Sequence, residues 1–102
     1  MSLTLLGEKI SAEEARSLGL VYKVVAQSGL IAEASALAEK LASEPTKGFA
    51  LTKKLMNQSF SSSLSEQLSL EADAQHEAGL SRDYAEGVRA FLEKRKPEYL
   101  GK

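Results

Sequence analysis

One short segment of this 102-residue chain has the composition of a β-strand, whereas the rest reads as helix and loop. Residues 20–25 (Leu-Val-Tyr-Lys-Val-Val) are rich in β-branched and aromatic side chains, which favour extended backbone. A lone strand would leave its backbone amides and carbonyls without partners. The sequence therefore predicts that this strand pairs either with another copy of the chain or with a sheet in a larger protein.

A short helix is expected just before this strand. Ser11 and Glu14 have the spacing of a capping box, in which each side chain accepts the other's backbone amide at the start of a helix. Gly19 fits the position after the last turn, because glycine adopts left-handed backbone angles without a Cβ clash. We therefore expect a helix from about residue 12 to residue 18.

From residue 28 onward the apolar side chains follow a helical period. Breaks at Pro45, at residues 61–63 (Ser-Ser-Ser) and at Gly79 divide this part into four amphipathic helices, and Pro97 stops the last one. Ser63 and Glu66 repeat the capping-box spacing. The predicted fold class is mainly α: a short helix, one strand and about four amphipathic helices.

Composition excludes several classes of protein. The chain has no Cys and one His, 43% of its residues are apolar, and its formal net charge is −1. No apolar run approaches the roughly 20 residues that a membrane span needs, and the balanced charge gives no attraction to nucleic acid. We expect one small cytoplasmic domain, or part of a larger one, with neither a membrane nor a nucleic acid as partner.

No pattern of catalytic or metal-binding residues stands out. His76 has no second His or Cys with ligand spacing, so we interpret it as an ordinary helix residue and expect no metal site. Glu13 and Glu14 fall in the first turn of a helix, where acidic side chains are stabilising for structural reasons. There is neither a Gly-x-Ser-x-Gly motif nor a glycine-rich phosphate loop. We expect no catalytic residue in this chain.

The one candidate binding pair is Phe91 and Lys94, near the end of the last helix. Residues three apart are neighbours on a helix, and an aromatic ring beside a cation can stack on a purine and neutralise a phosphate. The alternative interpretation is structural: Phe91 faces the core with Tyr84 and Val88, and the basic residues 94–96 complement the helix dipole in its last turn.

Several segments, taken in order, resemble the carboxy-terminal part of the enoyl-CoA hydratase/isomerase (crotonase) family. These segments are residues 6–15 (LGEKISAEEA), 19–21 (GLV), 24–25 (VV), 86–88 (EGV) and 90–97 (AFLEKRKP), together with Asp83. Residues 41–54 and 79–84 look most similar to the phenylacetate-pathway branch, whose members isomerise ring-epoxide or enoyl-CoA thioesters.

The resemblance implies a domain organisation and a role. Residues 1–27 correspond to the last helix–strand unit of the family's spiral core, which supplies the sheet partners of the lone strand. Residues 28–102 correspond to the helical domain that serves subunit association and covers the CoA site. The oxyanion hole and the proton-transferring carboxylates precede this part, so the chain alone is predicted to be inactive.

The resemblance also implies partners. Family members are commonly trimers or hexamers, and their substrate is an acyl-CoA thioester, with coenzyme A as part of the substrate and no covalently bound cofactor. Phe91 and Lys94 match the aromatic residue and the lysine that reach a neighbouring subunit's CoA. Two alternatives stay open from the sequence: a stand-alone, non-enzymatic helical oligomerisation module, and a free-standing acyl-CoA binder.

Overall fold

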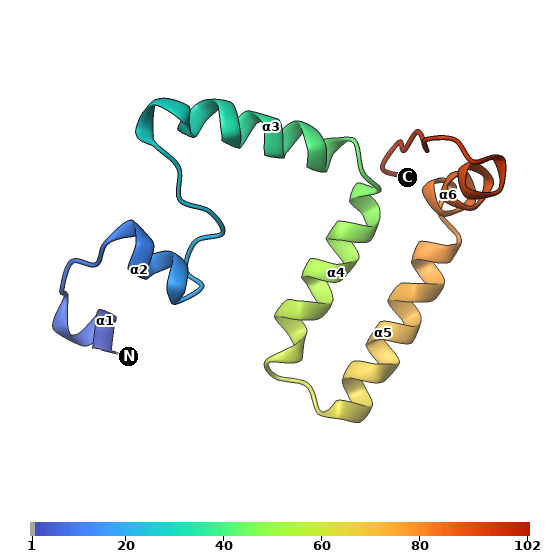
Figure 1. Ribbon diagram of the computed structural model, residues 1–102. Helices are drawn as coiled ribbons and strands as arrows, with labels where there is room; N and C mark the ends of the chain where they lie inside the picture. Colours follow the sequence, from blue (N-terminus) through green and yellow to red (C-terminus); the bar gives the residue numbers. More distant parts are fainter. Residues whose placement is uncertain (1) are drawn as a thin grey trace. The chain divides into compact units, whose positions relative to one another are not determined.

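A computed structural model describes residues 2–102, which form α-helices joined by loops (Figure 1). The helices are α1 (Ser2–Leu6), α2 (Ala12–Ser17), α3 (Leu30–Ala42), α4 (Thr46–Ser59), α5 (Leu64–Gly79) and α6 (Arg82–Glu93), with a 3₁₀ turn at Gln27–Gly29. The chain divides into two compact units, residues 1–35 and 36–102, with the division inside α3. The functional boundary predicted after residue 27 stays a prediction.

The first unit contains the short helix expected from the sequence. At its start, the Ser11 amide donates to Glu14 Oε2 at 2.8 Å and the Glu14 amide donates to Ser11 Oγ at 3.1 Å. The hydrogen bonds from Ser11 hold the pKa of the Glu14 carboxyl below its usual value. At the other end, Gly19 has φ +75°, and the Leu20 amide donates to the Ala15 carbonyl at 2.9 Å. Both the capping box and the role of Gly19 are confirmed.

The predicted strand is not observed. Residues 21–26 belong to neither a helix nor a sheet, and the described residues 2–102 contain no other strand with which this segment could pair. Val24 and Val25 are partly buried, whereas Tyr22 is exposed. A β-rich composition cannot produce a strand without a partner, because strand pairing supplies the missing hydrogen bonds.

The second unit contains an antiparallel helix pair, α4 and α5, with α6 packed against α5 (Figure 1). The loop between α4 and α5 ends in the second capping box, where the Ser63 amide donates to Glu66 Oε2 at 2.8 Å. Lys47 on α4 and Glu77 on α5 form an ion pair at 3.5 Å. The four predicted helices after residue 28 are therefore confirmed, as are the breaks at Pro45, at residues 61–63 and at Gly79 that separate them.

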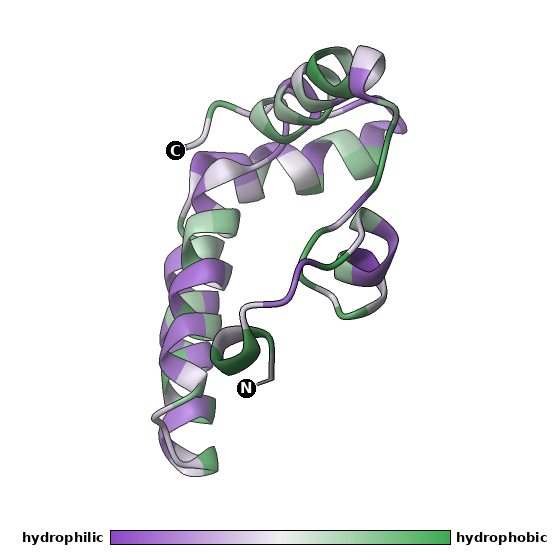
Figure 2. Ribbon diagram, turned by 90° about the vertical axis from the view of Figure 1, so that its left-hand side faces the viewer, coloured by the Kyte–Doolittle hydropathy of each residue, from purple (hydrophilic) through white to green (hydrophobic). Residues whose placement is uncertain are grey.

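Little of this chain is buried. Among the residues that the structure describes, only Ala90 and Asp83 are buried. Helices α3 to α6 contain hydrophobic residues, which colour parts of the ribbon green in Figure 2. Several of their large apolar side chains are exposed; examples are Ile31, Met56, Leu64 and Phe91. Burying one such side chain stabilises a protein by about 1.5–3 kcal/mol. These helix faces therefore have the composition of surfaces that are covered by other protein.

None of the helices within residues 2–102 has the length and apolar composition that crossing a bilayer requires.

Candidate functional site

The most apolar cavity of the second unit is a groove of about 430 Å³, which we call the aromatic groove. Helix α6 forms one wall, and the start of α4, the end of α5 and the segment after α6 complete it. Three aromatic rings line the groove, and Lys47 is its one cationic lining residue. The lining residues are Pro45, Lys47, Gly48, Ala78, Ser81, Asp83, Tyr84, Gly87, Val88, Phe91, Leu92 and Tyr99.

Phe91 lines this groove, but it does not belong to a core within this chain. Its side chain is 82% exposed, and Tyr84 and Val88 on the same helix are also exposed. The prediction that these three residues face inward is therefore wrong for the chain by itself. A ring with this exposure is free to contact a ligand or another protein surface.

Lys94 does not continue the helical face of Phe91. Helix α6 ends at Glu93, and Lys94 has left-handed backbone angles (φ 53°, ψ 39°). The Arg95 amide donates to the Ala90 carbonyl at 3.0 Å, which completes a Schellman-type helix end. The prediction that residues 94–96 form the last helical turn is therefore wrong, because the chain reverses at Lys94. Lys94 is exposed and is not among the residues that line the groove.

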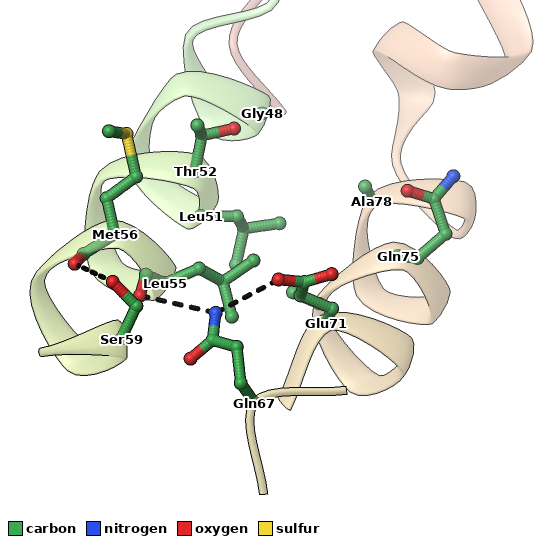
Figure 3. A pocket seen from close by; sticks show the side chains of 11 residues that line it. Gly48, Leu51, Thr52, Leu55, Met56, Ser59, Gln67, Glu71, Gln75 and Ala78 are labelled. Atoms are coloured by element: carbon green, nitrogen blue, oxygen red, sulfur yellow. Dashed lines mark hydrogen bonds between the residues drawn. The ribbon is translucent and has the colours of Figure 1, made fainter. Parts of the chain in front are cut away.

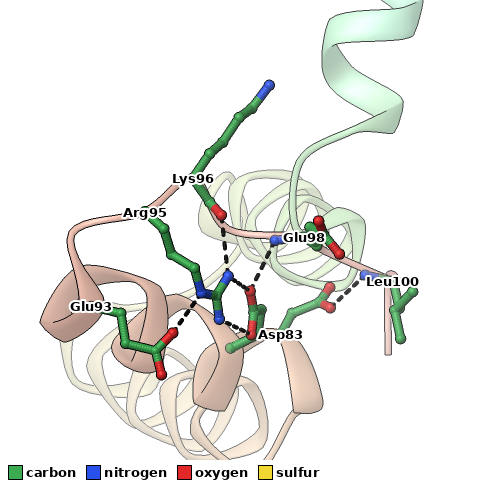
Figure 4. Close-up of polar contacts among 7 residues, drawn as sticks. Asp83, Glu93, Arg95, Lys96, Glu98 and Leu100 are labelled. Carbon is green, nitrogen blue, oxygen red and sulfur yellow. Dashed lines mark hydrogen bonds and ion pairs between the residues drawn. The ribbon is translucent and has the colours of Figure 1, made fainter.

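Glu86 holds the segment that follows this reversal, through contacts with Arg95 and Glu98, which are labelled in Figure 4. Arg95 pairs with it through two parallel hydrogen bonds, of 2.6 Å from Nη1 and 3.0 Å from Nη2. The Glu98 amide adds a third bond to Glu86 at 3.0 Å, and Arg95 Nε reaches Glu93 at 2.6 Å. The hydrogen bonds from Arg95, followed by the bond from the Glu98 amide, lower the pKa of the Glu86 carboxyl to about 2. In return, the Glu86 carboxylate raises the pKa of Arg95.

Asp83 holds the end of the same segment. Its side chain is 3% exposed, and its two oxygens accept the amides of Leu100 (2.7 Å) and Gly101 (2.8 Å), of which Figure 4 shows the first. The Asp83 amide donates to the Lys102 carbonyl at 3.1 Å. The buried charge is thus stabilised by backbone amides. Sequence reasoning missed this contact, because partners 17 and 18 residues apart leave no local pattern.

A second groove, of about 520 Å³, lies between α4 and α5 (Figure 3). Gln67 spans it: its Nε2 donates to Glu71 Oε1 at 3.1 Å and to the Leu55 carbonyl at 3.5 Å. The Oε1 atoms of Gln67 and Gln58 are buried without a hydrogen-bond partner. This groove is more polar than the aromatic groove, and its one carboxylate, Glu71, accepts the hydrogen bond from Gln67.

The remaining candidates occupy the positions expected from the sequence. His76 is exposed on α5, and Glu13 and Glu14 are exposed in the first turn of α2. Among residues 2–102, no group of three or more His, Asp or Glu side chains is placed to hold a metal ion. The aromatic groove, with its three rings and mainly apolar lining, can bind a flat apolar or aromatic group, whereas its one cation, Lys47, is paired with Glu77.

Comparison with known proteins gives a consistent result. The family description "Enoyl-CoA hydratase/isomerase" matches residues 1–102. The 1,2-epoxyphenylacetyl-CoA isomerase of Escherichia coli K12 is 46% identical over 102 residues, which is all of this chain and 39% of that protein. A probable enoyl-CoA hydratase of Rhodobacter capsulatus is 43% identical over the same length, which is 40% of that protein.

Solved structures agree with the sequence matches. A putative enoyl-CoA hydratase/isomerase from Mycobacterium abscessus superimposes with a TM-score of 0.94 at 38% identity, over 99% of this chain and 39% of that one. A putative enoyl-CoA hydratase from Streptomyces coelicolor gives a TM-score of 0.91 at 33% identity. The chain thus spans about 39% of the length of the relatives that it matches, and the matched part is their carboxy-terminal part. A stand-alone module is not favoured by these matches.

Proposed function

Because the chain belongs to the enoyl-CoA hydratase/isomerase family, we propose that it acts as the carboxy-terminal helical part of an enzyme whose substrate is an acyl-CoA thioester. In that role it covers the catalytic core and the CoA site and takes part in subunit association. The groups that polarise the thioester and transfer protons come from the part of the protein that these 102 residues do not include.

The observation that carries this proposal is the exposure of apolar side chains along every helix from α3 to α6. Ile31 on α3, Met56 on α4 and Leu64 on α5 are 76%, 63% and 77% exposed. Large contiguous apolar faces are typical of surfaces that pack against other protein. A core domain of the same protein, or a neighbouring subunit, supplies such a cover, and we propose a homo-oligomer for the complete enzyme.

Phe91 and Lys94 are the proposed contacts to coenzyme A. The Phe91 ring is exposed at the aromatic groove, which suits stacking on the adenine ring. Lys94 has a left-handed backbone that costs a lysine about 1–2 kcal/mol and a glycine almost nothing. A lysine at such a position supports a role for its side chain, because strained backbone is concentrated at functional sites.

Two finer proposals concern the pairing of residues 20–25 and the acyl group of the substrate. Residues 20–25 pair as an edge strand with the sheet of the complete enzyme, which their β-rich composition supports. The acyl group is of the phenylacetate type, for which the E. coli 1,2-epoxyphenylacetyl-CoA isomerase is the supporting relative.

The test is a chimera in which this chain replaces the matching carboxy-terminal part of the E. coli relative. We expect a folded protein that isomerises 1,2-epoxyphenylacetyl-CoA, whereas the truncated relative without the replacement is inactive. A soluble, folded chimera with no activity above that of the truncated protein would refute the proposed role.

The chimera also separates two proposed roles of Phe91, which are apolar cover and stacking on the adenine ring of CoA. Phe91→Leu keeps apolar cover but removes the aromatic plane, whereas Phe91→Ala removes both. If the ring stacks on CoA, both variants raise the KM, by about tenfold for the loss of about 1.4 kcal/mol. For the charge, Lys94→Gln is compared with Lys96→Gln, since Lys96 is an exposed lysine two residues away whose side chain has no described partner. An equal effect of both lysine variants would exclude a specific contact from Lys94.

A further inference from the structure

Residues 95–102, which we call the strap, follow the reversal at Lys94 and run back along α6 without regular secondary structure. We propose that Asp83 and Glu86 are positioning residues that fasten the strap on α6, and that the strap in turn places the Tyr99 ring as one wall of the aromatic groove. The proposal rests on the proposed function only for the ligand that enters the groove.

The order of the contacts shows that the strap runs antiparallel to α6. Arg95 and Glu98 bond to Glu86, and residues 100–102 bond to Asp83, one turn nearer the start of the helix. The two fastenings lie on either side of Tyr99, so the position of this residue is set from both directions. Glu86 is not among the residues that line the groove, and the two oxygens of Asp83, which does line it, are engaged by the Leu100 and Gly101 amides. Both carboxylates are therefore positioning residues, which act through the strap.

The Tyr99 ring packs against Gly87. Gly87 follows Glu86 directly on α6, and a Cβ atom at this position would lie 3.3 Å from the Tyr99 hydroxyl oxygen. Because glycine has no side chain, the ring comes close to the helix backbone and lines the groove beside Tyr84 and Val88. A strap that detached from α6 would remove this wall and leave the groove open on that side.

The far end of the strap reaches α4. Gly101 has φ +73°, and a Cβ atom there would lie 2.5 Å from Thr46 Oγ1, in the first residue of α4. The strap therefore bridges α6 and the start of α4, the two elements that face each other across the aromatic groove. Its fastening fixes the spacing of those walls as well as the Tyr99 ring.

The experiment uses nuclear magnetic resonance on the 102-residue chain and on four variants. In the wild type, we expect the Tyr99 ring to shift the Gly87 signals and the Leu100 and Gly101 amides to exchange slowly with solvent. Asp83→Asn and Glu86→Gln each remove one fastening. We expect both to abolish the ring shift at Gly87 and to accelerate exchange of the strap amides by about tenfold, which is the loss of one charge-assisted hydrogen bond.

Two further variants make the result specific. Tyr99→Ala removes the ring shift but leaves the Leu100 amide protected, because the fastenings stay in place. Glu98→Gln changes a carboxylate on the strap itself whose side chain has no described partner, so both signals stay as in the wild type. If Asp83→Asn prevents folding, Glu86→Gln still tests the proposal, because Glu86 is only partly buried whereas Asp83 is buried. An unchanged Gly87 signal in folded Glu86→Gln would overturn the proposal.

The chimera supplies the functional readout. With the strap released, Glu86→Gln raises the KM for the CoA thioester and leaves kcat unchanged, whereas general damage to the fold would lower kcat as well. A kcat loss with unchanged KM would overturn the positioning role. An inactive chimera whose isolated chain shows the expected magnetic resonance changes would refute the proposed function and leave the strap assignment standing.

Discussion

Lys94→Gly is predicted to stabilise the end of α6. The left-handed conformation of Lys94 costs an L-residue with a side chain about 1–2 kcal/mol, whereas glycine adopts it freely. The larger conformational entropy of glycine in the unfolded chain offsets about 0.5–1 kcal/mol of this stabilisation. The net stabilisation is therefore about 0.5–1 kcal/mol, or roughly a two- to fivefold change in an equilibrium constant.

The assay is hydrogen exchange at the Arg95 amide, whose bond to the Ala90 carbonyl closes the helix end. We expect Lys94→Gly to slow this exchange about threefold, and Lys94→Asn to slow it less, since asparagine tolerates the left-handed region better than most residues. Lys94→Ala is the matched control, because it removes the same charge without relieving the strain, and it should give no gain.

The same chain offers the reverse experiment. Gly19 ends α2 with φ +75° and the equivalent bond, from the Leu20 amide to the Ala15 carbonyl. Gly19→Lys should accelerate exchange of the Leu20 amide by a similar factor. Faster exchange at Arg95 in Lys94→Gly, or unchanged exchange at Leu20 in Gly19→Lys, would refute the reasoning.

Three other changes test separate parts of the structure. The pKa of Glu86 is lowered to about 2 from its usual value of 4.5, so its contribution to strap attachment is complete above pH 4.5 and is lost as the pH falls from 4.5 toward 2. An acid titration followed at the strap amides should show this release. A strap still fully attached at pH 2 would contradict the prediction. Ser63→Ala should lower the stability of α5 by about 1 kcal/mol, measured by thermal unfolding, because it removes the capping side chain. Ser65→Ala, at a neighbouring serine that does not cap the helix, should change this stability little. Gly101→Ala should detach the end of the strap, because its Cβ would collide with Thr46 at the start of α4. Gly79→Ala, whose Cβ would meet nothing within 4 Å, should leave hydrogen exchange of the strap amides unchanged. Equal effects of the two variants would exclude the close approach of Gly101 to Thr46.

Local sequence patterns predicted the helices well. The capping boxes at Ser11 and Ser63 and the glycine end at Gly19 depend on residues within four or five positions of one another, so their partners can be read from spacing alone. The reversal at Lys94 was missed because lysine gives no signal for left-handed backbone. The helix end there is closed by the bond from the Arg95 amide to the Ala90 carbonyl.

The candidate site was predicted only in part. Phe91 is exposed and lines the aromatic groove, whereas Lys94 does not line it, and the contact of both residues with CoA stays a prediction. The fastenings at Asp83 and Glu86 were not predicted, since they join residues 9 to 18 positions apart across an irregular segment. The strand predicted at residues 20–25 is absent, because residues 2–102 offer no other extended strand with which this segment could pair.

The central claim is that this chain contributes cover and CoA contacts to an enzyme and no catalytic group. The most direct measurement is the hydration of crotonyl-CoA and the isomerisation of an enoyl-CoA by the purified 102-residue chain. We predict no turnover above the uncatalysed background. Turnover that follows the chain through repeated purification, and that scales with its concentration, would contradict the claim.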